Sequence, residues 1–420
     1  MNWNFFQINK ACLQTQMVDP RRHPESPFLY VDISAIDRSL KVITNAPEIV
    51  GAEAPSRARK EIREGDVLVS TVRPNLNTVA IVPPELDGQI ASTGFCVLRP
   101  NRTAIEGKYL FYFTLTSEFI SILSNKVRGA HYPAVSDDDV KKIDLPLPPL
   151  SEQRRIVEIL DQADALRKKR IEADAKAARI LPALFYKMFG DLSTNPRGWP
   201  FKPLSDLGAQ VRYGLGQPPK TNETGIALIR ATNISRGTIS ATSMICVDPQ
   251  DVPPGRNAFL REDEVIVVRS GAYTGDVAQI TKEWEGCVAG YDLVITPGKS
   301  LTGEFVEAYL LTSFIQKGYF QNLKARAGQP HLNATQVSAT PFFDVPYDLQ
   351  IRFSKAVQTT RVLRKRRAKT NEKLDKTFGV LLHHAFTGKL TATWREAHMK
   401  ELLAEMEQQA KYLGIIGIKK

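Results

Sequence analysis

The chain has 420 residues, of which 43% are hydrophobic, and it carries 56 Lys and Arg against 45 Asp and Glu, a formal net charge of +11. This length is enough for two or more hydrophobic cores, and the positive charge is compatible with a nucleic acid, an acidic protein or a membrane surface as partner. The apolar runs are only strand-sized and the first residues lack the basic start and apolar core of a signal peptide, so we expect a cytoplasmic protein with no membrane partner.

The four cysteines stand far apart in the sequence, at Cys12, Cys96, Cys246 and Cys287. They form no CxxC pair of the kind that binds zinc, and they are too few for a disulfide framework. We expect them to behave as small buried hydrophobic side chains, and the sequence predicts no metal site.

The first domain is predicted to cover residues 1–146. Short apolar runs separated by Pro, Asn and Gly turns are typical of β-strands. Strands are expected at 28–31, 67–69 and 79–82, and one helix is expected over 108–125. Pro146, Pro148 and Pro149 close the domain, because proline forces an extended path before a helix and suits its first turn.

A long helical segment follows over residues 147–190. Ser151 is expected to cap its first turn, and Pro182 is expected to kink it near its end because proline removes a helical hydrogen bond. With Ile156 at position a of a heptad, only Arg170 among the a and d positions is polar. A seam of this kind needs a partner helix.

The second domain, residues 191–345, repeats this pattern. Strands are expected at 227–229, 265–268, 277–280 and 293–295, followed by a helix from Glu304 to about Leu323. Residues 346–390 form a second long helix, in which Arg367 has the same heptad position as Arg170. Residues 391–420 are expected to be a tail that contacts a partner.

Shifted by about 197 residues, the sequence matches itself, so that Pro149 falls on Pro346 and Gln153 on Gln350. This duplication predicts an α+β fold with two strand-rich α/β domains, joined and followed by long helices that pair as an antiparallel coiled coil with pseudo-twofold symmetry. The alternative is that each helix packs on its own domain instead of on the other helix.

The positive charge is concentrated in the helices. Residues 350–390 hold eleven Lys and Arg against two acidic residues, a net of +9, and residues 151–190 hold nine against six, a net of +3. These charges suit DNA phosphates or acidic partner subunits, and the alternative is a solvated helix face. The candidates for phosphate or partner contact are Lys168, Lys169, Arg170, Lys365, Arg366 and Arg367.

Two polar loops occupy matching places in each domain. One pair is 70–77 and 269–276, and the other is 128–133 and 326–333. Arg binds guanine with two hydrogen bonds and Asn or Gln does so with adenine, so such loops suit the reading of bases. Because the loops differ between the copies, two different half-sites are expected instead of a palindrome. The candidate DNA-binding residues are Arg73, Asn75, Asn77, Arg128, His131, Tyr132, Arg269, Ser270, Tyr273, Thr274, Arg326, Gln329, His331 and Asn333.

Motifs of familiar enzymes are missing. Gly298-Lys299-Ser300 resembles the end of a phosphate-binding loop, but the first glycine of that motif would have to stand at Leu293. HExxH, GxSxG and the Asn-Pro-Pro-aromatic tetrapeptide of amino-methylating enzymes are absent. The sequence therefore predicts recognition without catalysis.

Three features together resemble the specificity subunit of type I restriction-modification systems. They are residues 145–153, Leu-Pro-Leu-Pro-Pro-Leu-Ser-Glu-Gln, residues 386–391, Phe-Thr-Gly-Lys-Leu-Thr, and the duplication, and the resemblance covers essentially the whole chain. The second copy departs from the family, since Tyr347-Asp348-Leu349 replaces the Leu-Ser-Glu that precedes the glutamine.

The resemblance implies two target recognition domains, each reading one half of an asymmetric double-stranded DNA site, and a chain that is itself non-catalytic. The helices would set the gap between the halves and dock two adenine-methylating subunits and two ATP-dependent restriction subunits. S-adenosylmethionine, ATP and Mg²⁺ would be cofactors of those partners. A stand-alone DNA-binding regulator, an enzyme with an unrecognised site and a helical scaffold without a DNA role remain as alternatives.

Overall fold

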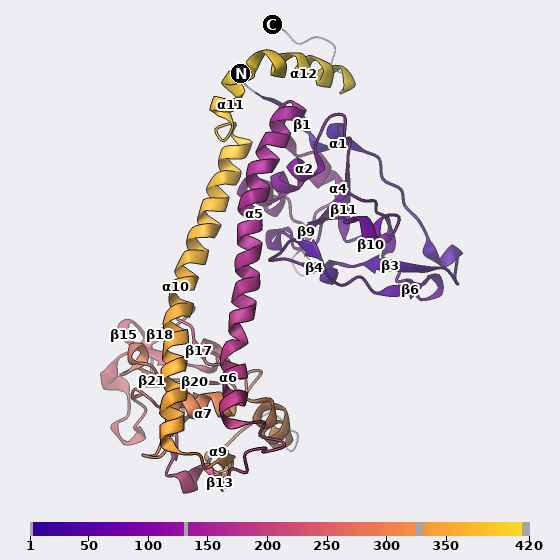
Figure 1. Cartoon of the computed structure of the whole chain (residues 1–420). Helices are drawn as coiled ribbons and strands as arrows, with labels where there is room; N and C mark the ends of the chain where they lie inside the picture. Colours follow the sequence, from indigo (N-terminus) through magenta and orange to yellow (C-terminus); the bar gives the residue numbers. More distant parts are fainter. Residues whose placement is uncertain (1–2, 130–132, 325–330, 414–420) are drawn as a thin grey trace. The chain divides into compact units, whose positions relative to one another are not determined.

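A computed structural model describes residues 3–129, 133–324 and 331–413 (Figure 1). The chain divides into two compact units. Unit 1 contains Met1–Glu172 and Lys369–Lys420, and unit 2 contains Ala173–Ala368. Each unit therefore combines one strand-rich domain with parts of both long helices, which confirms the predicted α+β fold class. Among the described helices, none is both long and apolar enough to cross a bilayer.

The domain of unit 1 is built on two four-stranded sheets. One has the order β2-β11-β8-β9 and the other β6-β3-β10-β7, in which β3 and β10 are parallel. The short β1 (Asn4–Gln7) pairs with β12 (Asp144–Leu147), and thus closes the beginning of the domain on its end. The other strands are β2 (Cys12–Leu13), β3 (Pro27–Val31), β4 (Ile36–Asp37), β5 (Val42–Ile43), β6 (Glu48–Val50), β7 (Ala58–Glu61), β8 (Val67–Ser70), β9 (Val79–Ile81), β10 (Ile90–Ser92) and β11 (Phe95–Pro100).

Unit 2 repeats this topology. Its sheet β14-β22-β19-β20 has the same order as β2-β11-β8-β9, and its parallel pair β15 and β21 corresponds to β3 and β10. The duplication read from the sequence is therefore a duplication of the fold. The strands are β13 (Phe201–Pro203), β14 (Gln210–Tyr213), β15 (Thr221–Ile229), β16 (Ile234–Ser235), β17 (Thr238–Ile239), β18 (Ile245–Val247), β19 (Val265–Val267), β20 (Val277–Gln279), β21 (Val288–Ala289), β22 (Leu293–Thr296) and β23 (Pro341–Phe343).

The prediction of a single helix over 108–125 is wrong, because two helices occupy this stretch. They are α2 (Gly107–Thr114) and α3 (Ser117–Asn125), and they separate where Thr116 accepts a hydrogen bond from the Phe119 amide at 3.2 Å and caps the second helix. A hydroxyl that caps a new first turn competes with continuation of the preceding helix. The helix expected from Glu304 to Leu323 is likewise divided, into α7 (Gly303–Leu310), a π-helix (Phe314–Phe320) and α8 (Gln321–Lys324).

The first long helical segment consists of α5 (Leu150–Ala178) and α6 (Ile180–Phe189). The break at Arg179 lies where Pro182 would clash with the carbonyl four residues earlier, so the helix is interrupted next to the predicted kink. The predicted cap is wrong: α5 begins before Ser151, at Leu150, and the Ser151 amide donates to Glu405 Oε2 at 3.1 Å. The second long helix, α10 (Tyr347–Phe386), runs without interruption.

The long helices contact each other within each unit and run antiparallel there. In unit 1 the start of α5, with Ile156 and Leu160, shares a core with Phe378 and Leu382 near the end of α10. In unit 2, Phe353 near the start of α10 contacts α6, its ring lying 5.8 Å from that of Phe185 and 5.4 Å from that of Phe189. These clusters also include strand residues of the domains, so the helices pack on the domains as well as on each other.

The two seam arginines make polar contacts between the helices. Arg170 Nε donates to Asn371 Oδ1 at 2.8 Å in unit 1. In unit 2, Arg367 donates to the carbonyl of Ala173 at 2.9 Å and pairs with Asp174 at 2.5 Å. A polar residue at a seam position can fix the register of two helices, because a slipped register leaves it unsatisfied.

A buried glutamine fastens α5 to the domain of unit 1. Gln153 Nε2 donates to the carbonyls of Ala104 and Pro148 at 3.1 and 2.8 Å, and its Oε1 accepts from the Glu106 amide at 2.9 Å. These three hydrogen bonds all go to backbone groups, so the side chain fixes the position of the helix start.

Gln350 does the same in unit 2. Its Nε2 donates to the carbonyls of Ser300 and Val345 at 2.9 and 3.2 Å, and its Oε1 accepts from the Thr302 amide at 3.1 Å. The two glutamines stand 197 residues apart, so the repeat extends to individual hydrogen bonds.

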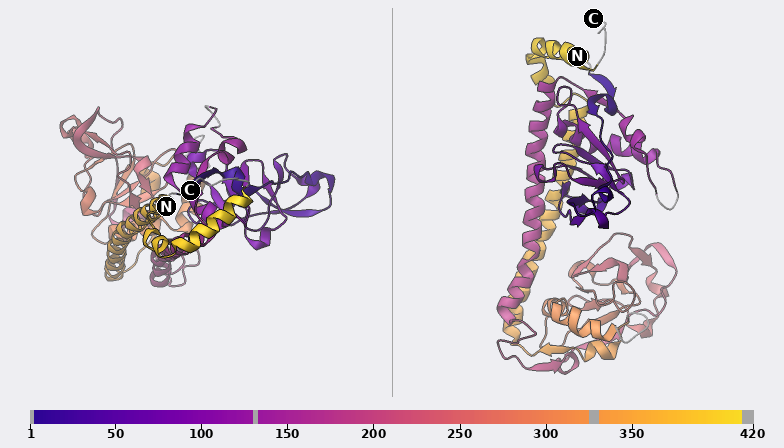
Figure 2. Two further views of the ribbon diagram at one scale, coloured as in Figure 1. Left: turned by 90° about the horizontal axis from the view of Figure 1, so that it is seen from above. Right: turned by 90° about the vertical axis from the view of Figure 1, so that its right-hand side faces the viewer.

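The C-terminal segment packs on unit 1 of its own chain. It contains α11 (Ala392–Ala397) and α12 (Met399–Tyr412), and Gln409 Nε2 of α12 donates to the Ala104 carbonyl at 2.7 Å. Figures 1 and 2 show α12 near the start of α5 and the N-terminal strand. Leu402 of α12 is buried in this packing.

The remaining helices of unit 1 and unit 2 are short, namely α1 (Ile8–Ala11), α4 (Asp137–Lys141) and α9 (Ala334–Ser338). The four cysteines are free, but only Cys96 is buried and the other three are partly buried, so the expected burial holds for one of them. Burial raises the pKa of the Cys12 thiol to about 12.

Candidate nucleic-acid interface

The two loops predicted in the first domain lie together in unit 1. Val72 and Ala134 form a β-bridge, the Arg73 amide donates to the Pro133 carbonyl at 2.8 Å, and the Val135 amide donates to the Thr71 carbonyl at 2.9 Å. Backbone hydrogen bonds thus join two segments that are about 60 residues apart in the sequence into one surface.

Arg73 and Asn75 are exposed on this surface. Arg73 has a left-handed backbone (φ +48°), which is uncommon for a residue with a side chain. Pro74 directly after it is buried and begins a 3₁₀ turn. The loop therefore has a defined conformation that directs two polar side chains to solvent.

Asn77 is bonded within the domain. Its Nδ2 donates to the Thr114 carbonyl at 2.7 Å, and its Oδ1 accepts from Lys41 Nζ at 2.9 Å. Burial, and the nearby cations Arg167 and Arg38, lower the pKa of Lys41 to about 8. Asn77 holds the loop in place, and base contact by this residue stays a prediction.

Arg128 of the second loop has a side chain that is 76% exposed and lies 3.5 Å from Asp139. The other two residues predicted in this loop, His131 and Tyr132, lie outside the described residues.

The matching loops of unit 2 lie together in the same way. Ser270 and His331 form a β-bridge, and the Leu332 amide donates to the Arg269 carbonyl at 2.9 Å. Tyr273 is half exposed. Arg326 and Gln329 lie outside the described residues.

Two of the predicted residues in unit 2 are bonded within their own loops. Thr274 is buried, and its hydroxyl donates to the Gly271 carbonyl at 2.6 Å. Asn333 caps α9 by accepting from the Gln336 amide at 2.9 Å. Both side chains stabilise the loop conformation, and their contact with bases stays a prediction.

Arg269 contacts two tyrosine rings that the sequence did not suggest. Its guanidinium carbon lies 4.8 Å from the ring centre of Tyr213 and 4.4 Å from that of Tyr291, and its Nη2 lies 3.2 Å from His331 Nε2. Arginine only donates, so the histidine nitrogen accepts and the ring is neutral. Burial and the neighbouring Arg269 lower the pKa of His331, which favours that neutral form.

Asp292 lies beneath this group and is almost completely buried. Its Oδ1 accepts from the Arg269 amide at 3.1 Å, whereas its Oδ2 is buried without a hydrogen-bond partner. Burial raises the pKa of this carboxyl to about 6. Asp292 thus holds the backbone of Arg269, although the two residues are 23 positions apart in the sequence. The sequence pattern did not reveal this contact.

Several of the six basic helix residues proposed for phosphate or partner contact make contacts within their own unit. Arg170 and Arg367 join the helices as described, Lys168 pairs with Asp164 at 2.8 Å, and Lys365 pairs with Glu283. The side chains of Lys169 and Arg366 are exposed. The role of all six in binding phosphate or partners stays a prediction.

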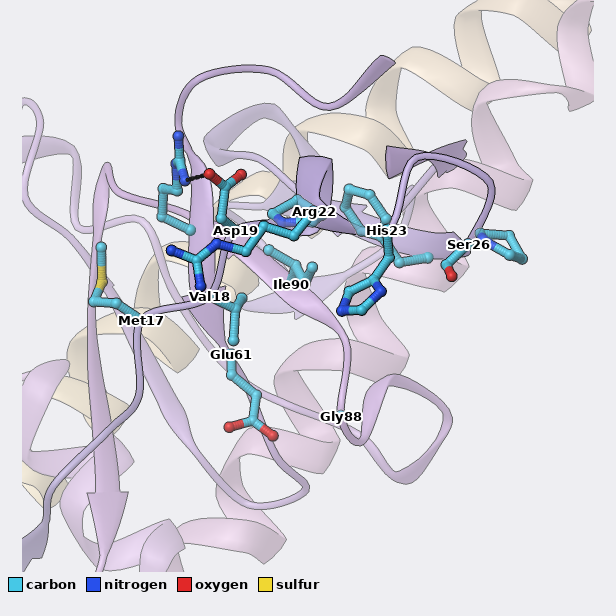
Figure 3. A pocket seen from close by; sticks show the side chains of 13 residues that line it. Met17, Val18, Asp19, Arg22, His23, Ser26, Glu61, Gly88 and Ile90 are labelled. Atoms are coloured by element: carbon cyan, nitrogen blue, oxygen red, sulfur yellow. Dashed lines mark ion pairs between the residues drawn. The ribbon is translucent and has the colours of Figure 1, made fainter. Parts of the chain in front are cut away.

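A cavity of about 770 Å³ lies elsewhere in unit 1, between residues 17–28 and strands β7 and β10 (Figure 3). Asp19 and Arg59 form an ion pair of 2.6 Å at its wall, and Glu61 Oε2 is buried without a partner. The wall carries charges of both signs, so its chemistry does not single out one ligand. In the described part of the chain, no group of three or more His, Cys, Asp or Glu is placed to hold a metal ion.

The comparisons with known proteins point to one family. The family "Type I restriction modification DNA specificity domain" matches residues 41–176. The HindI specificity subunit of Haemophilus influenzae is 28% identical over 142 residues, which are 33% of this chain and 31% of that protein. The EcoDI specificity subunit of Escherichia coli is 29% identical over 202 residues, 47% of this chain and 44% of that protein. The chain thus spans less than half of these two relatives.

Longer matches exist as well. The StySPI specificity subunit of Salmonella potsdam is 25% identical over 328 residues, 72% of this chain and 69% of that protein. A solved structure, from work on the structural basis underlying complex assembly and conformational transition of the type I R-M system, has 28% identity and a TM-score of 0.57. The match covers 93% of this chain and 98% of that one.

Proposed function

The chain belongs to the family of type I restriction-modification specificity subunits, and from this premise we propose that it is the non-catalytic DNA-reading subunit of such a complex. Each of its two target recognition domains reads one half of a bipartite, asymmetric site in double-stranded DNA. Its activity is recognition, and the chemistry is carried out by other subunits.

One observation carries this proposal: both domains present the same paired loops with different side chains. The bridge Val72–Ala134 in unit 1 is matched by Ser270–His331 in unit 2, at a spacing of 197 to 198 residues. The shared backbone geometry supports a shared role, and the different side chains support different base sequences. Arg73, Asn75 and Arg128 are the proposed readers in unit 1, and Arg269, Ser270, Tyr273 and His331 are those in unit 2.

We propose that the long helices set the gap between the half-sites and dock the partners. The contacts of Arg170 and Arg367 between the helices support a fixed register. The expected partners are two adenine-methylating subunits and two ATP-dependent restriction subunits, which would bind S-adenosylmethionine, ATP and Mg²⁺. The candidates for contact with phosphates or partners are Lys168, Lys169, Arg170, Lys365, Arg366 and Arg367, of which Lys169 and Arg366 have exposed side chains.

The proposal is tested by mapping methylated adenines across the genome of a host that carries this chain and its methylating subunit. We expect one bipartite, asymmetric motif. Exchanging residues 1–146 for the first domain of another family member should change one half of the motif only. A change in both halves, or one uninterrupted motif, would contradict the modular assignment.

Insertion of four residues into α5 tests the role of the helices separately. At about 1.5 Å per residue, four residues add about 6 Å to the helix, or nearly two base pairs of DNA. The gap in the motif should lengthen while both half-sites stay the same. An unchanged gap would show that the helices do not determine it.

A further inference from the structure

The group formed by Tyr213, Arg269, Tyr291 and His331, which we call the Arg269 stack, holds an arginine in an unusually fixed position on unit 2. Tyr213 ends strand β14, Tyr291 follows strand β21, and Arg269 follows strand β19. The guanidinium carbon lies over both rings, 4.8 Å from the centre of Tyr213 and 4.4 Å from that of Tyr291. Attraction between a cation and each ring face stabilises this arrangement.

Two glycines allow the tyrosines to approach. Gly214 follows Tyr213 and Gly290 precedes Tyr291, and a Cβ on Gly214 would lie 2.2 Å from the Gly290 carbonyl oxygen. Any side chain at Gly214 would therefore push the two segments apart and open the stack. The close backbone approach and the position of the rings depend on each other.

The Arg269 stack leaves hydrogen-bonding capacity of the arginine unused. The Arg269 amide is held by Asp292 and its Nη2 by His331. Within residues 3–129, 133–324 and 331–413, Nη1 has no hydrogen bond, the guanidinium has no ion pair with a carboxylate, and Nε is buried without a partner, so the N–H groups open to a ligand are those of Nη1 and Nη2. Tyr213 and Tyr291 are 38% and 47% exposed, so the group lies at the surface.

An arginine fixed in this way suits a base edge better than a phosphate. Guanine offers two acceptors, O6 and N7, which match two parallel N–H groups of a guanidinium in its own plane. The freedom that the side chain would lose on binding is already lost in the free protein, which favours a contact that demands one orientation. A phosphate contact carries no sequence information and does not demand one orientation of the guanidinium.

We propose that the Arg269 stack reads a G·C pair in the half-site recognised by unit 2. This inference rests on the proposed function and adds which residue reads which base. At the equivalent backbone position unit 1 has Thr71 instead of an arginine, and this residue is buried and donates to the Gly94 carbonyl at 3.0 Å. The two half-sites therefore differ at this position.

The test replaces Arg269 in the full chain, expressed with its methylating subunit, and maps methylated adenines. The natural chain should give a bipartite motif with at least one G·C pair in the half-site of unit 2. Arg269→Gln should lower the preference for guanine at one such position by about tenfold or more, within the range of about 5- to 150-fold typical of a two-hydrogen-bond contact, and leave the other half-site unchanged. Arg256→Gln, at an exposed arginine of the same domain, should leave every base preference unchanged.

Arg269→Lys separates base reading from charge. Lysine keeps a cation beside the rings and so keeps the fold, but it loses the planar fork, and guanine preference should fall as with glutamine. If Arg269→Lys keeps the preference, or Arg269→Gln weakens all positions alike, Arg269 contacts phosphate and the proposal is wrong. An absence of guanine from that half-site also overturns it. A natural chain that yields no bipartite motif would instead refute the proposed function.

Discussion

Replacing Arg395 by methionine should destabilise unit 1 by about 3–5 kcal/mol, because it leaves a charged carboxylate without its cation in the protein interior. Glu152 at the start of α5 is completely buried, and the side chain of Arg395 is 11% exposed. Arg395 Nε donates to Glu152 Oε1 at 2.7 Å. Thr391 Oγ1 donates to the same oxygen at 2.6 Å, and Trp3 Nε1 donates to Oε2 at 3.1 Å.

The repeat itself provides the control for this prediction. Leu349 occupies the place of Glu152 in the second copy and packs against the core of unit 2. The double variant Glu152→Leu with Arg395→Met removes both charges, so it should recover most of the loss and lie within about 2 kcal/mol of the natural chain. The double variant should therefore be destabilised much less than the sum of the losses of the two single variants.

The assay is urea unfolding of the purified chain, followed by tryptophan fluorescence in a Trp199→Phe, Trp284→Phe background. Trp3 and Trp394 then report on unit 1 alone. A loss below about 1 kcal/mol for Arg395→Met would show that water reaches Glu152. A double variant as unstable as Arg395→Met would show that packing of Arg395, and not its charge, stabilises the tail.

Asp292→Asn should raise the free energy of unfolding of unit 2 by about 3 kcal/mol at pH 8, because burial raises the pKa of this carboxyl to about 6. A carboxyl whose pKa is higher in the folded than in the unfolded state contributes stability that is complete below about pH 4 and is lost as the pH rises through 6. The difference in unfolding free energy between Asp292→Asn and the natural chain should therefore disappear by about pH 4. An equal difference at about pH 4 and about pH 8 would contradict this reasoning. Gly214→Ala should lower the melting temperature of unit 2 through the 2.2 Å contact with the Gly290 carbonyl, whereas Gly255→Ala meets nothing within 4 Å and should change the stability by less than about 0.5 kcal/mol. Gln350→Leu should destabilise unit 2 by about 1–3 kcal/mol in urea unfolding. Gln153→Leu should destabilise unit 1 less, because Gln409 still donates to the Ala104 and Pro148 carbonyls. A larger loss for Gln153→Leu would mean that Gln409 does not satisfy these carbonyls.

Several features of this protein were predictable because neighbouring residues encode them. The strands at Val67–Ser70 and Val265–Val267 follow from short runs of β-branched residues. The break before α6 follows from Pro182. The seam positions of Arg170 and Arg367 follow from the heptad, and both do contact the opposite helix.

The candidate site was predicted only in part. The sequence located the loops, and the structure joins them through the Val72–Ala134 and Ser270–His331 bridges. The sequence did not distinguish exposed Asn75 from Asn77, whose side-chain amide donates to the Thr114 carbonyl and accepts from Lys41. A polar residue in a loop has the same local pattern whether it reads a ligand or holds the loop, because its partner lies elsewhere in the sequence.

The sequence by itself determined the duplication, the alternation of strand-rich domains with long helices, and the family, since these depend on periodicity and on motifs of adjacent residues. Only the tertiary structure decided which side chains meet. Tyr213 and Tyr291 contact Arg269 from separate segments of the chain, and Glu152 pairs with Arg395, 243 residues away. Such contacts depend on the path of the whole chain, because short-range patterns fix an element and its buried face but leave its partner open.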